Sequence, residues 1–171
     1  QETMEGSLIK CYLAYDAWLT CSTHAFSTEN QEIMGLLLGR WVEDGTIALV
    51  DSALVLARSD RQKDRVEVGY DQLAAASEMA EQQEKKFGRE CRVIGWYHSH
   101  PHITVHPSHV DVRTQGQYQA MDSAFLGLIF SCFSQDSTSN INRIEVTAFQ
   151  AAGSHSNINS NNNSFPSTCT C

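Results

Sequence analysis

Two histidines follow an apolar run, and this pattern restricts the fold more than any other feature of the 171-residue chain. Residues 93–97 read Val-Ile-Gly-Trp-Tyr, which predicts a buried strand that His98 and His100 continue. Side chains two apart on a strand point to the same face, so both imidazoles should aim at one place. Pro101 lacks an N–H group and cannot continue a central strand, so the chain should leave the sheet just after His100.

A serine and an aspartate follow the histidines at fixed offsets. Ser108 begins a segment, through Met121, that can be helical, which places Asp111 in the first helical turn. Two neutral imidazoles and one carboxylate leave a fourth tetrahedral position open, as in catalytic zinc sites and unlike closed structural sites. The spacing therefore predicts a metal site made of His98, His100 and Asp111, with one Zn²⁺ per chain.

Each part of this pattern also has an ordinary structural interpretation. Two histidines two apart on a strand are more often a surface pair or hydrogen-bonded core residues than metal ligands. Ser-x-x-Asp at a helix start is also a capping arrangement, in which Ser108 accepts a backbone N–H. We prefer the metal site because the histidines, the proline, the serine and the aspartate occur together at the end of an apolar strand.

Hydrophobic periodicity predicts helices interleaved with strands along the chain. Asp16 should cap the first helix, Asp71 should open the second, and Gly88 should end it. The expected helices cover 17–26, 71–87 and 108–121, and the expected strands cover 33–41, 47–57, 66–68, 91–97, 124–133 and 141–149. This order predicts an α/β (α+β) fold with a central mixed sheet flanked by helices.

Length and composition indicate a single compact unit. A chain of this size with 42% hydrophobic residues can bury one core, which we place in residues 8–150. Residues 1–7 should form a flexible N-terminus. Residues 151–171 are rich in Asn and Ser with almost no apolar anchor, so we expect a disordered tail.

Charge and cysteine usage exclude several functional classes. The net charge is −8 and there is no Lys/Arg cluster, which argues against nucleic-acid binding through a basic face. No apolar stretch approaches the ~20 residues of a membrane span, and no secretory pattern is visible. The six cysteines make no spaced pairs except the last two, which favours reduced thiols in an intracellular protein. A deaminase zinc site would need His-x-Glu and Pro-Cys-x-x-Cys, and the chain has neither.

The metal motif is similar to that of the JAMM (MPN-plus) metalloproteases, a family that cleaves ubiquitin or ubiquitin-like proteins from lysine side chains. Residues 95–105, 107–115 and 127–133 carry the resemblance, which extends over roughly residues 8–150. It implies the MPN fold, and within the family it is closest to the branch specific for lysine-63-linked polyubiquitin. It also implies that zinc is held by His98, His100 and Asp111.

The resemblance implies two further residues with chemical roles. The family requires a glutamate far upstream, and the matching position is Glu32. Such a hydrolase needs a base that takes a proton from the attacking water and an acid that returns one to the leaving lysine amine. Ser108 would donate to the oxyanion that develops on the carbonyl. Composition alone favours a solvated surface charge for Glu32, so only the resemblance supports its role.

We therefore expect a zinc-dependent deubiquitinating isopeptidase that cleaves lysine-63-linked polyubiquitin. The resemblance implies a larger complex such as BRISC, an Abraxas-like MPN-minus partner, and a location in nucleus and cytoplasm. A deneddylase-like activity is an alternative, disfavoured because residues 101–105 replace the Gly and Cys-Trp-Leu of that branch. A non-catalytic MPN scaffold subunit is the other alternative. Neither nucleic acid nor a membrane is expected as a direct partner.

The chain departs from the family pattern in two places. Relatives usually carry a bulky apolar or aromatic residue two places before the serine, where this chain has His106. That position should lie near the scissile tail of ubiquitin, where its imidazole could compete for the metal. The resembled proteins also continue with another core strand and C-terminal helices that pair with a partner. We therefore expect this chain by itself to be weakly active and prone to associate.

Overall fold

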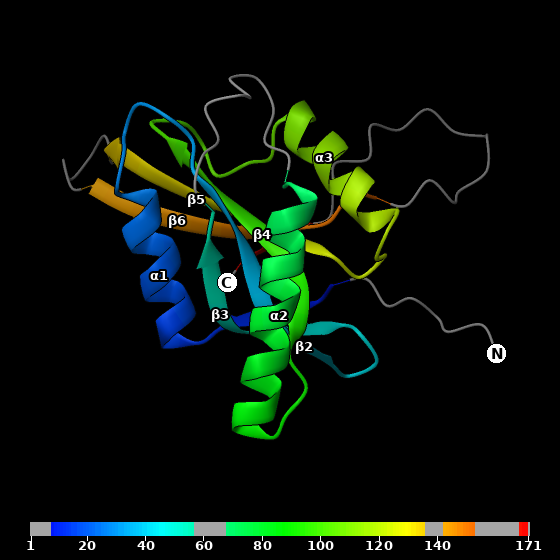
Figure 1. The fold of residues 1–171 in the computed structure, drawn as a ribbon. Coiled ribbons are helices and arrows are strands. Elements are labelled where there is room, and N and C mark those ends of the chain that lie inside the picture. Colours follow the sequence, from blue (N-terminus) through cyan, green and yellow to red (C-terminus); the bar gives the residue numbers. More distant parts are fainter. Residues whose placement is uncertain (1–7, 57–67, 136–141, 153–167, 171) are drawn as a thin grey trace, which may run out of the picture.

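The computed structural model describes residues 8–56, 68–135, 142–152 and 168–170 (Figure 1). Strands and helices alternate through most of this part of the chain, as the hydrophobic periodicity predicts. In order, the elements are β1 (Lys10–Leu13), α1 (Tyr15–Ala25), β2 (Met34–Val42), β3 (Ile47–Val55), α2 (Tyr70–Phe87), β4 (Arg92–Pro101), α3 (His109–Gln119), β5 (Leu126–Gln135), β6 (Asn142–Phe149) and β7 (Thr168–Thr170).

The strands form one mixed sheet. Within the described residues its order is β1-β3-β2-β4-β5-β6-β7. β2 pairs antiparallel with both β3 and β4, whereas β4 and β5 run parallel and are connected through α3. The predicted α/β fold with a central mixed sheet flanked by helices is therefore confirmed.

The sheet separates two hydrophobic clusters. One packs against α1 and includes Leu37 and Tyr97, and the other packs against α2 and α3 and includes Leu36 and Trp96. Consecutive residues of a strand point to opposite faces, so β2 and β4 each contribute to both clusters. β4 is a central strand buried on both faces, and its last residues carry the predicted metal ligands.

Some predicted element boundaries are wrong. The predicted cap Asp16 lies inside the first turn of α1, whose N-cap is Ala14, because the helix begins at Tyr15. The helix α2 begins one residue before Asp71, with Gly69 as its N-cap. Val68 lies outside any strand, and the other two residues of the predicted 66–68 strand fall outside the described residues.

One further boundary prediction is confirmed. Gly88 ends α2 in the left-handed region at φ 64°, which only glycine adopts without steric cost. The chain leaves β4 one residue later than predicted, because Pro101 still pairs with Cys132, and His102 then turns the chain away at φ 63°. The four-residue strand β1, which runs parallel to β3, was not predicted because so short a segment carries no clear periodicity.

The end of the chain differs from the expected disordered tail. Thr168–Thr170 form β7, which pairs antiparallel with β6, so the prediction of disorder is wrong for these three residues. Ala151 is also held, because its N–H donates to Gln119 Oε1 at 2.7 Å. Residues 153–167 and 171 lie outside the described residues, as do residues 1–7, which were predicted to be flexible.

Cys21, Cys91 and Cys132 lie in the core as free thiols, and Cys11 is buried as well. Burial raises the pKa of the Cys21 thiol to about 12, so it stays protonated and behaves as a small apolar side chain. The free thiols of Cys21, Cys91 and Cys132 agree with the predicted reduced state. No helix in the described part of the chain is long and apolar enough to cross a membrane.

Candidate metal centre

The structure brings the three predicted ligands together. β4 places His98 and His100 on one face, and the first turn of α3 places Asp111 opposite them. The Nε2 atoms of the two histidines are 3.1 Å apart. Asp111 Oδ1 lies 3.1 Å from His98 Nε2, and Asp111 Oδ2 lies 3.3 Å from His100 Nε2. All three residues are buried, and they form the one group of this kind found among the described residues.

Neighbouring groups fix the orientation of the two imidazoles. His100 Nδ1 lies 2.7 Å from the Thr104 carbonyl oxygen, which can only accept, so Nδ1 carries a proton and Nε2 is the nitrogen that faces Asp111. The His98 ring stacks on Trp96, with ring centroids 4.6 Å apart and an interplanar angle of 11°. Trp96 is held in turn, because its Nε1–H donates to Gln115 Oε1 at 2.7 Å. Both rings are therefore preorganised.

Ser108 is the N-cap of α3 and also lies beside the metal ligands. Its Oγ accepts the Asp111 N–H at 3.2 Å, and its own N–H donates to Asp111 Oδ2 at 2.6 Å, which completes a capping box. The capping interpretation of Ser-x-x-Asp is therefore correct, and it coexists with the ligand group. The cap uses the hydroxyl as an acceptor, so the O–H of this exposed serine can still donate to a substrate.

The charges in this group suit a cation. Burial alone would raise the pKa of Asp111, but hydrogen bonds with His100 and His98 outweigh it and hold that pKa well below its usual range. Burial lowers the pKa of His100, whereas its bonds to Asp111 and Thr104 raise it, and the rise dominates. An ionised carboxylate and two converging imidazole nitrogens are the donor set of catalytic zinc sites. The residues present therefore fit a bound zinc ion.

Glu32 lies two residues before Met34, the first residue of β2. Met34, the first residue of β2, pairs with His98, so Glu32 sits at the same end of the sheet as the ligands. Its side chain is exposed, and its negative charge contributes to the raised pKa of His100. The structure thus places the glutamate at the same end of the sheet as the metal group, although the two are far apart in the sequence.

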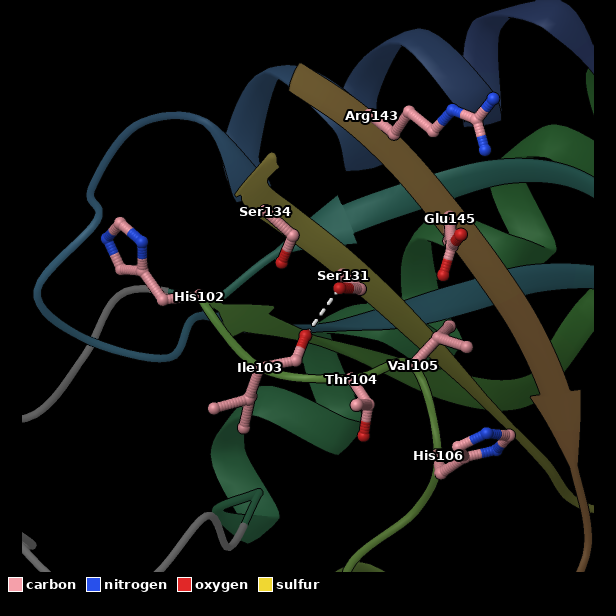
Figure 2. Close-up of a pocket in the computed structure, with 9 residues that line it drawn as sticks. All are labelled: His102, Ile103, Thr104, Val105, His106, Ser131, Ser134, Arg143 and Glu145. Carbon is pink, nitrogen blue, oxygen red and sulfur yellow. Dashed lines mark hydrogen bonds between the residues drawn. The ribbon is translucent and has the colours of Figure 1, made fainter. Parts of the chain in front are cut away.

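A pocket with a volume of about 620 Å³ lies where the segment after β4 faces β5 and β6 (Figure 2). One wall is the segment of residues 102–106, and we call the hollow the 102–106 pocket. This wall is fixed on both sides: Thr104 contacts His100, and the Ile103 carbonyl accepts from Ser131 Oγ at 2.5 Å. The remaining lining residues come from β5 and β6: Ser131, Ser134, Arg143 and Glu145.

His106 lines this pocket and does not join the ligand group. The expected competition of its imidazole for the metal therefore has no support in the structure. Sequence reasoning singled out His106 but missed Ser131 and Glu145. The signal lies on β6, where polar and apolar residues alternate around Glu145, and strand pairing places Ser131 opposite it.

The mixed sheet presents two histidines at a strand end and an aspartate at a helix start, and together they form a group that could hold a metal ion. The family model described as JAB1/Mov34/MPN/PAD-1 ubiquitin protease matches residues 7–124. The chain therefore belongs to this family, and its fold is the MPN fold that the motif resemblance implied.

Comparison with curated proteins points to one branch of the family. The chain is 53% identical over 136 residues to the Lys-63-specific deubiquitinase BRCC36 of Xenopus tropicalis, covering 80% of this chain and 52% of that protein. It is 47% identical over 163 residues to BRCC36 of Homo sapiens, covering 82% and 52%. The same identity relates it to the mouse Lys-63-specific deubiquitinase BRCC36-like, covering 82% and 56%. The chain thus spans about half the length of these relatives.

Proposed function

We propose that this chain is a zinc-dependent isopeptidase that cleaves lysine-63-linked polyubiquitin. The observation that carries the proposal is the buried group of His98, His100 and Asp111 on a domain of this family. The substrate and the linkage are supported by relatives that are named Lys-63-specific deubiquitinases and are 47–53% identical.

His98 Nε2, His100 Nε2 and the Asp111 carboxylate would hold the metal. When bound, Zn²⁺ supplies Lewis acidity, which polarises the scissile carbonyl and makes a water molecule acidic enough to be deprotonated near neutral pH. The ligand residues contribute preorganisation, because the Thr104 carbonyl and the Trp96 ring already hold both imidazoles in place.

Glu32 and Ser108 would act on the reacting groups. The reaction breaks the C–N bond between the ubiquitin carbonyl carbon and the lysine Nζ, and the water oxygen bonds to that carbon. Glu32 takes a proton from the water and delivers one to Nζ, so that lysine leaves as an amine. The Ser108 hydroxyl donates to the carbonyl oxygen as negative charge develops there, and removing such a donor costs on the order of 10²- to 10³-fold in turnover.

We further propose that the chain works with an MPN-minus partner of the Abraxas type in a larger intracellular complex, located in nucleus and cytoplasm. The complex and the partner rest on the family resemblance of the sequence. The buried free thiols support a reducing compartment.

Cleavage of a diubiquitin panel tests the proposed function. The purified chain, alone and with an MPN-minus partner, is incubated with each linkage type and with a NEDD8 conjugate. We expect lysine-63-linked diubiquitin to be cleaved in preference to every other substrate. Preferred cleavage of the NEDD8 conjugate would indicate a deneddylase instead, and no cleavage in either preparation would indicate a scaffold subunit.

Zinc content is the second expected result. Protein purified without added metal should contain one zinc per chain by elemental analysis, because the described residues supply one complete ligand group. A chelator should remove both the zinc and the isopeptidase activity, and added Zn²⁺ should restore them. His109→Ala is the matched control, since this exposed histidine neighbours the site without belonging to the ligand group. A stoichiometry near zero in the parent protein would contradict the site.

Substitution of His106 tests whether the 102–106 pocket contacts substrate. We expect His106→Trp to lower KM for lysine-63-linked diubiquitin by about two- to tenfold, since one aromatic contact contributes roughly 0.5–1.5 kcal/mol. His106→Ala should change KM little. Steady-state kinetics on both variants decide the matter, and an unchanged KM in the Trp variant would make this position a loop surface without a role in binding.

A further inference from the structure

Ser99 lies between the two histidine ligands on β4 but points away from them. Side chains alternate along a strand, so His98 and His100 share one face of the sheet whereas Ser99 shares the other with Tyr97. Tyr97 belongs to the hydrophobic cluster that packs against α1, and Ser99 is fully buried at 0% exposure. The Ser99 hydroxyl therefore touches neither the ligand group nor the substrate side of the sheet.

The Ser99 hydroxyl takes the place of a backbone carbonyl as the hydrogen-bond acceptor of Ile33, the residue that precedes β2. In an antiparallel sheet, a hydrogen-bonded pair exchanges two N–H···O=C bonds between backbones. The Ser99 N–H donates to the Ile33 carbonyl at 3.1 Å, as that pattern requires. The Ile33 N–H, however, donates to Ser99 Oγ at 3.0 Å rather than to a carbonyl. At this end of the β2–β4 pairing, a bond to the Ser99 side chain thus replaces one backbone hydrogen bond.

Glu32 directly precedes Ile33 in the sequence. The two hydrogen bonds between Ile33 and Ser99 therefore restrain the backbone next to Glu32. The Glu32 side chain is exposed, and within the described residues no hydrogen bond or ion pair holds its carboxylate. A long exposed side chain has many rotamers, so the position of the Glu32 Cα atom determines which positions its carboxylate can reach. Both backbone polar groups of Ile33 form hydrogen bonds with Ser99, which lies between His98 and His100. These bonds restrain the backbone next to Glu32 relative to the two histidines.

We propose that Ser99 is a positioning residue: its buried hydroxyl anchors the Ile33 backbone and thereby holds Glu32 beside the metal group. The part of this inference that concerns turnover rests on the proposed function, in which Glu32 transfers protons. The anchoring itself is a property of the fold and is measured without substrate.

The first test is nuclear magnetic resonance of the purified chain and its Ser99→Ala variant. Loss of the hydroxyl should make the Ile33 amide exchange faster with solvent, and the Glu32 amide order parameter should fall from about 0.85 toward 0.6. Ser99→Thr keeps an acceptor oxygen at the same place and should restore both values. The Leu37 amide, in the middle of β2, should be unchanged in every variant and serves as the internal reference.

Ser52→Ala is the matched control. Ser52 is a half-buried serine of β3 whose hydroxyl donates to Gln83 Oε1 at 2.9 Å, so its loss removes a comparable side-chain bond elsewhere in the sheet. It should leave the Ile33 and Glu32 amides as they are. If Ser99→Ala does not fold, Ser99→Cys replaces it, because sulfur has a similar size and is a weak acceptor.

The second test is kinetic and uses lysine-63-linked diubiquitin. Ser99→Ala should keep its zinc and its KM but lose on the order of 10- to 100-fold in kcat, since a displacement of ~1 Å of a catalytic group costs about 10²-fold. Ser99→Thr should recover most of the lost kcat. A purely structural role would lower zinc content and folded fraction together and would not produce this selective loss.

The outcomes separate the two hypotheses. A protected Ile33 amide and a rigid Glu32 amide in Ser99→Ala would overturn the anchoring. An unchanged kcat in an active variant whose Ile33 amide has lost its protection would overturn the positioning role in turnover. If the parent chain cleaves no ubiquitin substrate with or without a partner, the proposed function fails. The amide measurements then still decide whether Ser99 holds Glu32 in place.

Discussion

Asp111→Ala should release the zinc and reduce isopeptidase activity to background. Asp111 is the anionic member of the ligand group, and its two carboxylate oxygens each approach one histidine nitrogen. Without it, two neutral imidazoles remain, which is fewer than the three protein ligands of catalytic zinc sites. Elemental analysis and diubiquitin cleavage on the same preparation measure the two effects together.

The capping box complicates this experiment, because Asp111→Ala also removes the acceptor of the Ser108 N–H. A lost helix cap costs about 0.5–2 kcal/mol, which lowers stability independently of the metal. Asp111→Asn keeps an acceptor for the cap but lacks the charge, so it should lose zinc and keep the helix. Asp122→Ala removes another aspartate and should retain full zinc content. Zinc retained in full by Asp111→Ala would show that the ligand assignment is wrong.

Glu32→Gln should keep its zinc and lose about 10²- to 10⁴-fold in kcat, the usual contribution of a general acid–base group. Glutamine has nearly the same size and polarity, but it cannot accept and return a proton. The expected pattern is therefore the opposite of that for Asp111→Ala, in which metal and turnover disappear together. Steady-state kinetics and metal analysis distinguish the two patterns.

Glu29→Gln is the control for Glu32. Glu29 is exposed on the same segment and lies 3.7 Å from His102 at the surface, so its replacement changes the local charge equally. Its kcat should remain within about twofold of the parent, because surface ion pairs contribute little. Equal cleavage rates for Glu32→Gln and the parent chain would mean that the proton-transfer role belongs to another group.

The ligand group could be predicted from sequence because its geometry is local. The period of a strand puts His98 and His100 on one face, and a helix start a few residues later carries Asp111. Glu32 could not be predicted in this way, since its place depends on the pairing of β2 with β4. Ile33 and Ser99 are 66 residues apart, and no periodicity connects segments at that separation. Glu32 could be singled out only through the family resemblance, because no local sequence pattern relates it to the metal ligands.

Two further features show where sequence reasoning stops. The Ser-x-x-Asp pattern allowed a cap or a catalytic site, and a single hydroxyl can serve both because capping uses only its acceptor side. The 102–106 pocket, by contrast, depends on the pairing of β5 with β6. Sequence shows that Ser131 and Glu145 are polar, but only the register of those strands places them together.

The ligands come from two separate elements, the end of β4 and the start of α3, and this couples metal binding to the free energy of unfolding. A metal that binds the folded chain alone stabilises it by RT ln(1 + [L]/Kd), about 4 kcal/mol when the free metal is a thousandfold above Kd. That is a large share of the 5–15 kcal/mol by which domains of this size are usually stable. With zinc bound as proposed, the resistance of this fold to heat should therefore rise with the logarithm of the free zinc concentration.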